Sequence, residues 1–356
     1  MKKYKINEIE NKRILGRAIE NVGKENDLCL LWGSSALEIN VCAKEVWVCL
    51  EQNYDTFENW VSVEVNGFQI SRFIAPKEAT WICISRGLNP ENQNLISIIK
   101  DTQPMADEAH HALFIKGIAL DDDGVFMSIK PRPLSFEFIG DSITSGEGLA
   151  GGAFEQDWIT QWFCSSKSYA ATVSKEFNAD FSVISQCGWG LCWGWDGNEN
   201  TNLYSHYQNV CSLLRGDYHK TLGTQKEYDF SKQNDWVIIN LGTNDNSALN
   251  IENSNKNIEN FYETAKSFLQ IIRNKNKNAK ILWTLGMISL DKIPSVVQKA
   301  ILNYKKESSD ENVFYLQLDS MSDLEKNDKD RGSRGHPGQI THDAAAKKII
   351  EFIKNN

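Results

Sequence analysis

The chain has 356 residues, of which 41% are hydrophobic and 24% charged, as is usual for a globular protein with a sizeable core. Its length exceeds what one hydrophobic core usually organises, so we expect two domains. The formal net charge of −9 argues against a nucleic-acid or anionic-membrane partner, because binding to phosphates needs clustered Lys and Arg.

The N-terminal residues 1–10 carry positive charge, but no apolar stretch follows them, so they do not resemble a secretory signal. No apolar run approaches the length that spans a bilayer. We therefore expect a cytoplasmic protein. None of the eight cysteines forms a CxxC pair with metal-ligand spacing, and we interpret them as buried, reduced thiols.

Short apolar runs separated by turn residues, without helical periodicity, predict an all-β domain over residues 28–130. Between two of these runs, Asn66-Gly67 favours the positive φ angles of a type I′ hairpin turn. Seven or eight such strands indicate a β-sandwich of the jelly-roll kind. The predicted strands are residues 37–42, 45–51, 60–65, 68–74, 80–85, 95–100 and 113–117.

Lys130-Pro131-Arg132-Pro133 predicts a stiff connector, because proline fixes its own φ and restricts the preceding residue. We therefore expect a first domain at 1–130 and a second at 131–356. In the second, strands alternate with helices, which predicts a three-layer α/β/α domain with a parallel sheet. Strands are expected at 136–139, 181–185, 236–241, 280–285 and 313–317, and helices at about 168–177, 258–272, 293–307 and 340–354.

The first of these strands ends in the run GDSITSGEG, residues 140–148, which places Ser142 in a glycine-rich turn. A serine in such a turn is exposed above the sheet edge and can act as a nucleophile. Asp-Ser is also an ordinary helix N-cap signal. The two interpretations are compatible, and we expect Ser142 at a helix start, where free amides assist an oxyanion.

Two further loops follow predicted strands: Cys187-Gly188-Trp189-Gly190 and Gly242-Thr243-Asn244-Asp245. Ligands of parallel sheets bind at the carboxyl ends of the strands, so these loops should meet Ser142. The Gly188 amide and the Asn244 side chain are candidate donors to an oxyanion. Taken singly, each loop could equally supply only turn glycines and a helix cap.

Among the six histidines, His336 is the best candidate for a base. It lies in a loop between the last strand and the last helix, which returns it to the same rim of the sheet. There it could take the Ser142 proton and later protonate a leaving alcohol. His342 is expected to cap or pack at the start of the last helix, and His110 and His111 to lie on the surface of the first domain.

Four blocks in order resemble those of the SGNH/GDSL hydrolases: Gly140-Asp141-Ser142, Gly188, Gly242-Thr243-Asn244-Asp245 and Gly335-His336-Pro337. With the β-sandwich in front, the chain resembles carbohydrate esterase family 2 over nearly its whole length. The resemblance implies a serine esterase that removes acetyl groups from sugars, such as acetylated xylo- or gluco-oligosaccharides, without a metal or organic cofactor.

By the same resemblance, Ser142 is the nucleophile and His336 the base, and the oxyanion hole comprises the Ser142 and Gly188 amides and the Asn244 side chain. SGNH enzymes usually place an aspartate three residues before the histidine, where this chain has Ser333. Family 2 esterases are known for a Ser–His dyad oriented by a backbone carbonyl, so this departure agrees with that family. Asp330 is the alternative group that could orient the histidine.

Trp189, Trp193 and Trp195 follow the Gly188 donor directly and could form a sugar-stacking wall or pack beneath a long loop. Two other functions remain open. One is a lipid esterase or thioesterase of the same superfamily, and the other is a carbohydrate-binding protein with a decayed active site. No pattern in the sequence indicates an oligomeric state.

Overall fold

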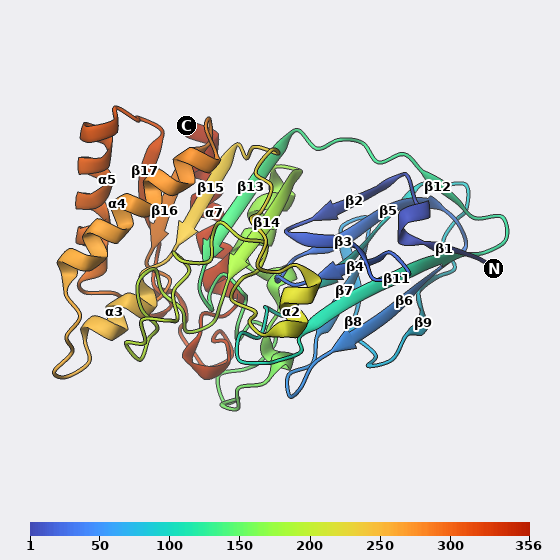
Figure 1. The fold of residues 1–356 in the computed structure, drawn as a ribbon, viewed down its shortest axis with the longest axis horizontal. Coiled ribbons are helices and arrows are strands. Elements are labelled where there is room, and N and C mark those ends of the chain that lie inside the picture. The colour runs from blue at the N-terminus through green and yellow to red at the C-terminus, as the bar shows by residue number, and fades with distance from the viewer. The chain divides into compact units, whose positions relative to one another are not determined.

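The computed structural model describes all residues from 1 to 356, which form two compact units (Figure 1). The first comprises residues 1–131 together with 209–228, and the second comprises residues 132–208 and 229–356. The proline-rich connector at 130–133 includes the point where the chain passes from the first unit to the second. The assignment of residues 209–228 to the first unit was not expected from the sequence.

The first unit contains two antiparallel sheets that share one core, which confirms the predicted β-sandwich. One sheet has the strand order β3-β4-β11-β6-β9 with β1 beside β11, and the other has β12-β5-β10-β7-β8 with β2 beside β5. The strands are β1 (Lys2–Lys5), β2 (Lys12–Leu15), β3 (Ala18–Val22), β4 (Asp27–Leu30), β5 (Ala36–Cys42), β6 (Glu45–Asn53), β7 (Trp60–Val65), β8 (Phe68–Ile74), β9 (Thr80–Arg86), β10 (Asn94–Lys100), β11 (Ala112–Leu120) and β12 (Val125–Met127). Two short helices, η1 (Ile6–Glu8) and α2 (Asp217–Leu222), complete this unit.

The hairpin between β7 and β8 follows directly from its sequence. Val61 and Val63 alternate into the core, and Val65 pairs with Phe68 across the turn. The two turn residues, Asn66 and Gly67, both have positive φ angles, of 53° and 86°. All seven predicted strands are present, whereas β1 to β4 and β12 were missed because each has only three to five residues.

Residues 209–228 are bound to the sandwich by specific hydrogen bonds. The Trp32 indole N–H donates to the Val210 carbonyl at 2.7 Å, and the His111 backbone N–H donates to His219 Nε2 at 3.1 Å. His111 is fully buried, so the expectation that it lies on the surface is wrong. Its ring packs inside the unit because this segment covers it.

The second unit contains a parallel sheet with the strand order β14-β13-β15-β16-β17, which confirms the predicted α/β domain. Its strands are β13 (Leu134–Gly140), β14 (Ala179–Ser185), β15 (Trp236–Asn240), β16 (Lys280–Leu285) and β17 (Val313–Gln317). Its α-helices are α1 (Tyr169–Glu176), α3 (Thr243–Leu249), α4 (Ile258–Lys275), α5 (Ile293–Ser308), α6 (Met321–Leu324) and α7 (Gln339–Asn355). Three short 3₁₀ turns are η2 (Thr160–Trp162), η3 (Ser165–Lys167) and η4 (Ser333–Gly335).

Helices lie on both faces of this sheet. Helices α1 and α7 share a core with Phe136, Phe138 and Ile238 of the central strands, and α4 packs against α5. In Figure 1, α4 passes in front of the sheet and α7 behind it. The strand order reverses at β13, which has β14 on one side and β15 on the other, so the carboxyl ends of these strands form the crevice in which open parallel sheets bind ligands.

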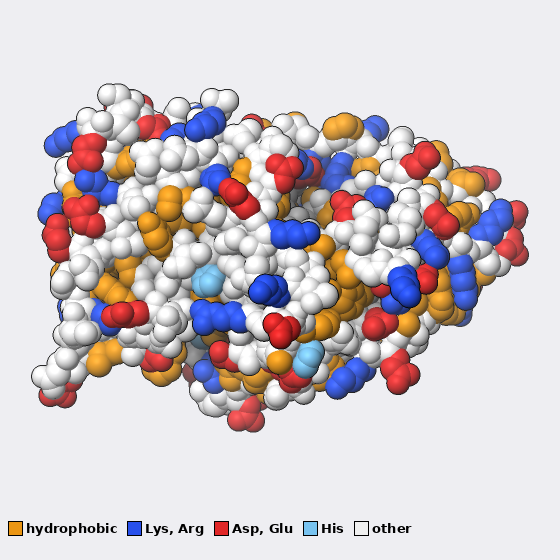
Figure 2. Space-filling model, viewed as in Figure 1, with side chains coloured by type: hydrophobic (Ala, Val, Ile, Leu, Met, Phe, Trp, Pro, Cys, Tyr) orange, Lys and Arg blue, Asp and Glu red, His pale blue; other side chains and the backbone are white.

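No helix combines the length and the apolar sequence that a membrane crossing requires. On the face of the molecule shown in Figure 2, acidic and basic side chains are interspersed. That face therefore shows no continuous basic patch of the kind that binds a phosphate backbone.

Candidate active site

Ser142 lies in a tight turn that begins where β13 ends. The Ser145 N–H donates to the Asp141 carbonyl and the Glu147 N–H donates to the Ser142 carbonyl, both at 3.0 Å. These bonds close a compact turn and no regular helix follows, since the next α-helix begins at Tyr169. The expectation that Ser142 starts a helix is therefore wrong, because the glycines at 146 and 148 both adopt positive φ.

The structure brings Ser142 and His336 together from positions 194 residues apart. His336 Nε2 lies 2.9 Å from Ser142 Oγ, and the two residues are partly shielded, with Ser142 only 7% exposed. Gly148, with a φ of +86°, permits this approach, because an added Cβ there would lie 2.9 Å from the His336 Cβ. Only glycine fits both the backbone angle and the space.

A backbone carbonyl, and not an acid, faces the other ring nitrogen of His336. Nδ1 lies 3.2 Å from the Arg334 carbonyl, which favours the tautomer with its proton on Nδ1 and leaves Nε2 free to accept from Ser142. The Ser333 hydroxyl at the usual acid position is buried without a hydrogen-bond partner. The site therefore has the geometry of a dyad.

Arg334 presents its carbonyl to His336 from a left-handed conformation, with φ of 55° and ψ of 34°. Such a conformation costs about 1–3 kcal/mol in a non-glycine residue and persists only where its surroundings enforce it. Here the Arg334 N–H donates to the Glu155 carbonyl at 3.0 Å, and its guanidinium donates to the Gln156 carbonyl at 3.2 Å. These contacts fix the loop that carries the histidine.

Asp330 does not orient His336 in the structure. Its carboxylate accepts from the Lys326 N–H at 3.1 Å and from the Asn327 side chain at 3.0 Å, both within its own turn. The alternative that Asp330 replaces the missing acid is thus wrong, because these local bonds hold its carboxylate within residues 326–330 and the Arg334 carbonyl occupies the position beside Nδ1.

Three N–H groups in the loops that follow β13, β14 and β15 have no acceptor within the chain. The Ser142 and Gly188 backbone amides donate no hydrogen bond within the chain. The Asn244 side-chain amide donates one N–H to the Trp189 carbonyl at 2.8 Å, and its second N–H is left for a ligand. The turn that exposes the Gly188 amide requires a φ of +74°, which glycine adopts without strain.

Asp245 ties the loop after β14 to helix α3. Its buried carboxylate accepts backbone N–H groups from Leu191 at 2.8 Å, Cys192 at 2.7 Å and Trp193 at 3.2 Å. Burial raises the pKa of Asp245 to about 6, although these hydrogen bonds oppose the rise. The sequence interpretation treated Asp245 only as a helix cap; in the structure it fixes the loop that begins with Gly188.

The three tryptophans of that loop have different environments. Trp189 and Trp193 are 7% and 5% exposed, so for these two residues the structure favours packing, the second of the two alternatives, over a stacking wall. Trp189 packs against the His206 ring at 5.4 Å. Trp195 is 63% exposed, and its backbone N–H donates to the Gly188 carbonyl at 3.0 Å. Of the three tryptophans, only Trp195 is largely exposed.

A buried carboxylate that the sequence analysis overlooked, Glu147, also lies at the serine. Its Oε2 atom is 3.4 Å from His336 Nε2 and accepts the Cys187 thiol at 2.6 Å, and its Oε1 atom accepts Arg334 Nε at 3.3 Å. The signal in the sequence was an acidic residue between two glycines, directly after the serine turn. Side chains from three loops thus meet around one carboxylate.

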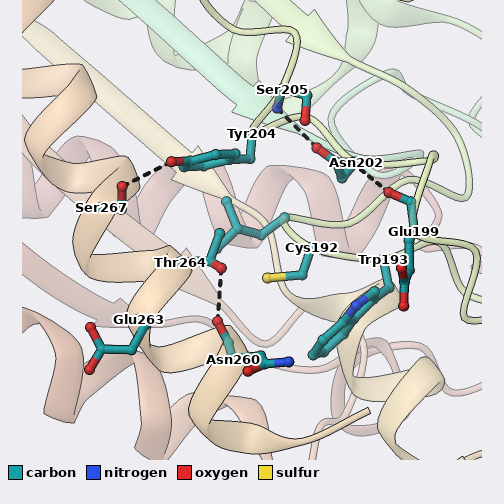
Figure 3. Close-up of a pocket in the computed structure, with 11 residues that line it drawn as sticks. Cys192, Trp193, Glu199, Asn202, Tyr204, Ser205, Asn260, Glu263, Thr264 and Ser267 are labelled. Atoms are coloured by element: carbon teal, nitrogen blue, oxygen red, sulfur yellow. Dashed lines mark hydrogen bonds between the residues drawn. The ribbon is translucent and has the colours of Figure 1, made fainter. Parts of the chain in front are cut away.

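A hollow of about 520 Å³ lies elsewhere in the second unit, between residues 191–205 and helix α4 (Figure 3). The Tyr204 hydroxyl bonds to the Ser267 hydroxyl at 2.9 Å across it. The lining residues are Leu191, Cys192, Trp193, Glu199, Asn202, Tyr204, Ser205, Asn260, Glu263, Thr264 and Ser267. This lining contains no histidine, so the hollow holds no serine–histidine pair.

The comparison with known families agrees with this geometry. Residues 138–344 match the GDSL-like lipase/acylhydrolase family. The chain belongs to this family. The match includes Ser142, His336 and the donors beside them, so the site described above is the part of the chain that the family shares.

Known structures also resemble this GDSL-family protein over both units. An acetyl xylan esterase, Est2A from the rumen bacterium Butyrivibrio proteoclasticus, is 32% identical with a TM-score of 0.90, and the match covers 100% of this chain and 99% of that one. A family two carbohydrate esterase from Clostridium thermocellum, in complex with cellohexaose, is 24% identical with a TM-score of 0.81 over 97% of this chain and 98% of that one. The resemblance to SGNH/GDSL hydrolases with the two-domain plan of carbohydrate esterase family 2 is confirmed.

A curated relative is the cellulase/esterase CelE of Acetivibrio thermocellus, which is 25% identical over 329 residues. The match covers 91% of this chain but 37% of CelE, so the chain spans little more than a third of that protein's length. In this GDSL-family chain, the hydroxyl of Ser142 lies 2.9 Å from the His336 ring, and acyl transfer requires a hydroxyl and a base of these kinds together with N–H donors.

Proposed function

We propose that this protein is a serine esterase that removes O-acetyl groups from carbohydrates. The observation that carries the proposal is the 2.9 Å contact between Ser142 Oγ and His336 Nε2, beside three available N–H donors at the carboxyl edge of the parallel sheet. The full-length similarity to the acetyl xylan esterase Est2A supports the substrate class. The substrate would be an acetylated oligosaccharide of the xylo or gluco type.

In the first half of the reaction, Ser142 Oγ attacks the carbonyl carbon of the acetyl ester and its proton passes to His336 Nε2. The carbonyl oxygen becomes negative and accepts hydrogen bonds from the Ser142 and Gly188 amides and from Asn244. When the intermediate collapses, the bond to the sugar oxygen breaks and His336 gives its proton to that oxygen. The sugar leaves with a free hydroxyl, and the acetyl group remains on Ser142.

In the second half, a water molecule attacks the acetyl-serine and gives one proton to His336 Nε2. Collapse of this second intermediate releases acetate, and the proton returns to Ser142 Oγ. Throughout, the Arg334 carbonyl at 3.2 Å from Nδ1 keeps the imidazole in the tautomer that this exchange needs.

Trp195 would bind the sugar that carries the acetyl group. Its indole is largely exposed, and an added Cβ on Gly188 would lie 3.0 Å from the Trp195 ring. A flat aromatic face beside the oxyanion donors can stack against a pyranose ring while the ester points towards Ser142.

The test is hydrolysis of p-nitrophenyl acetate, p-nitrophenyl octanoate and acetylated xylo-oligosaccharides by the wild type, Ser142→Ala and His336→Ala. We expect turnover of both acetyl substrates by the wild type and loss of turnover in both variants. Equal rates for Ser142→Ala and the wild type would exclude the mechanism. A preference for octanoate would instead favour a lipid esterase, and an inactive wild type that binds the oligosaccharide would favour a carbohydrate-binding protein.

A further inference from the structure

Glu147 is a buried carboxylate that the reaction outlined above does not use. Its side chain is 1% exposed, and it follows the serine by five residues in the same turn. Its Oε2 atom lies 3.4 Å from His336 Nε2, the nitrogen that also contacts Ser142 Oγ at 2.9 Å. The nitrogen that receives the serine proton therefore has a carboxylate beside it.

This position differs from that of the acid in a Ser–His–Asp triad. A triad aspartate bonds to Nδ1 and does two things: it holds the tautomer, and its charge stabilises the imidazolium. Here the Arg334 carbonyl holds Nδ1 at 3.2 Å but has no net charge. The stabilising negative charge has to come from another direction, and Glu147 is the carboxylate that contacts the ring.

We propose that Glu147 is the positioning acid of the Ser142–His336 pair, and that its charge stabilises the His336 imidazolium from the Nε2 side. The inference rests on the proposed function. When Ser142 Oγ attacks the ester, its proton moves to Nε2, and the new N–H lies beside both Ser142 Oγ and Glu147 Oε2. No proton passes to Glu147; its negative charge is balanced in place by the positive ring.

Two neighbours donate hydrogen bonds to the Glu147 carboxylate. The Cys187 thiol donates to Oε2 at 2.6 Å, and burial together with Glu147 holds the pKa of that thiol well above its ordinary value, so it stays protonated. Arg334 Nε donates to Oε1 at 3.3 Å. Arg334 therefore acts twice, with its carbonyl on one side of His336 and its guanidinium on the acid at the other side.

Two more titratable groups face this pair. His342 is fully buried, and burial followed by the nearby His336 lowers its pKa to about 3, so it is neutral at working pH. Burial raises the pKa of Asp141, which feels the charge of Glu147, to about 7. His342 contributes the same background to each pH profile, whereas the pKa of Asp141 should fall in Glu147→Gln, because a charge that helps to raise it is removed.

The first test is the pH dependence of kcat/KM for p-nitrophenyl acetate. Removing the negative charge with Glu147→Gln disfavours the imidazolium, so the acidic limb should move to lower pH by about one unit. The plateau should fall about tenfold with little change in KM, since the transition state loses the charge. Arg334→Gln removes the cation that offsets Glu147, so its acidic limb should move to higher pH.

Opposite shifts in these two variants separate an electrostatic role from a structural one. The matched control is Glu325→Gln, since Glu325 is also buried and its carboxylate accepts the Gly338 N–H at 2.6 Å and the Thr341 hydroxyl at 2.8 Å at the start of α7. It should lower Tm without moving the acidic limb. The proposal would be overturned if the acidic limb of the kcat/KM profile did not move in Glu147→Gln, or if it moved equally in Glu325→Gln.

A second measurement does not depend on esterase activity. The full chain, labelled at histidine, is titrated by NMR as Ser142→Ala and as the double variant Ser142→Ala/Glu147→Gln. The His336 ring should titrate about one pH unit lower in the double variant, and identical midpoints would contradict the role of Glu147. If the wild type proves inactive while the midpoint shifts, the esterase proposal fails and the charge interaction stands. Should Glu147→Gln not fold, Glu147→Asp retains the charge and should keep the acidic limb near that of the wild type.

Discussion

The Ser142 site and the hollow beside α4 lie in the same unit but use their polar groups differently. In the hollow, the Tyr204 hydroxyl bonds to Ser267, and the Thr264 hydroxyl bonds to the Asn260 carbonyl at 2.8 Å. At the Ser142 site, two backbone amides have no partner within the chain, and a hydroxyl faces a base. The size of a cavity is therefore a poorer guide to function here than polar groups left available for a ligand.

One loop serves both regions. It begins with the Gly188 amide at the serine, and its residues from Leu191 onwards line the hollow. Asp245 fixes residues 191–193, where the loop reaches the hollow, through three backbone N–H groups. Matched substitutions in the two regions can therefore separate a direct effect on chemistry from a general effect on this loop.

The largest contrast should come from the two serines. Ser142→Ala removes the nucleophile and should lower kcat for p-nitrophenyl acetate by about 10⁴-fold or more. Ser267→Ala removes only a hydroxyl that bonds to Tyr204 and should leave kcat within about twofold of the wild type. Comparable losses in both variants would contradict the distinction between the two regions.

The next contrast is between two asparagines. Asn244→Ala deletes one oxyanion donor and should reduce kcat by about 10²- to 10³-fold. Asn260→Ala, on the lining of the hollow, should not change it. Steady-state rates with p-nitrophenyl acetate provide the comparison, and Tm values report whether either variant is destabilised. A normal kcat for Asn244→Ala would remove this side chain from the oxyanion hole.

A smaller effect is expected from the tryptophans. Trp195→Ala should raise KM for acetylated xylo-oligosaccharides about two- to tenfold, because a stacking surface is lost. It should leave p-nitrophenyl acetate hydrolysis unchanged. Trp193→Ala should instead lower the free energy of unfolding by about 3–5 kcal/mol, because Trp193 is buried. A rise in KM with p-nitrophenyl acetate as well would place Trp195 closer to the ester than we propose.

The smallest expected effect concerns the pH dependence of stability. The pKa of Asp245 is raised to about 6 in the folded state, from an ordinary value of 3.8. The folded protein therefore binds this proton more tightly than the unfolded chain, and the resulting stability is present below about pH 4 and lost as the pH rises to about 6. Tm should fall by a few degrees over this range on account of Asp245.

Asp245→Asn should remove this part of the fall in Tm with rising pH, because an amide does not titrate. Glu263→Gln, at an exposed position on the lining of the hollow, should leave the change of Tm with pH as it is in the wild type. Thermal melts at pH 4, 5, 6 and 7 supply the measurement. An identical slope for the wild type and Asp245→Asn would show that Asp245 does not titrate in this interval.

Much of the fold could be predicted because its longer strands are short apolar runs separated by turn residues. The run at 236–240 is buried throughout, and the hairpin at 66–67 has Asn-Gly, a pair that favours the positive φ angles of its turn. The strands that were missed are too short for a pattern to develop. Residues 209–228 could not be assigned from sequence, because their partners in the first unit are about 100 or more residues away.

The site residues that could be predicted are those whose position follows from the order of strands and loops along the chain. Ser142, Gly188 and Asn244 all follow strand ends, and the parallel topology brings such loops to one rim. Glu147 and Arg334 were not recognised, since their importance arises from contacts between loops distant in sequence. For Trp189 and Trp193, the sequence left a stacking wall and packing as alternatives, because their burial depends on how the long loop folds over its own side chains.

Because residues 209–228 belong to the first unit, they affect how the chain folds during synthesis and where it can be cleaved. Cys211, Leu213 and Leu214 of this segment are fully buried in the folded protein. During synthesis, the sandwich cannot be completed until residue 228 has left the ribosome, after β13 and β14 have already been translated. Cleavage of the chain after residue 131 would give a sandwich without its last segment and a hydrolase fragment with that apolar segment exposed.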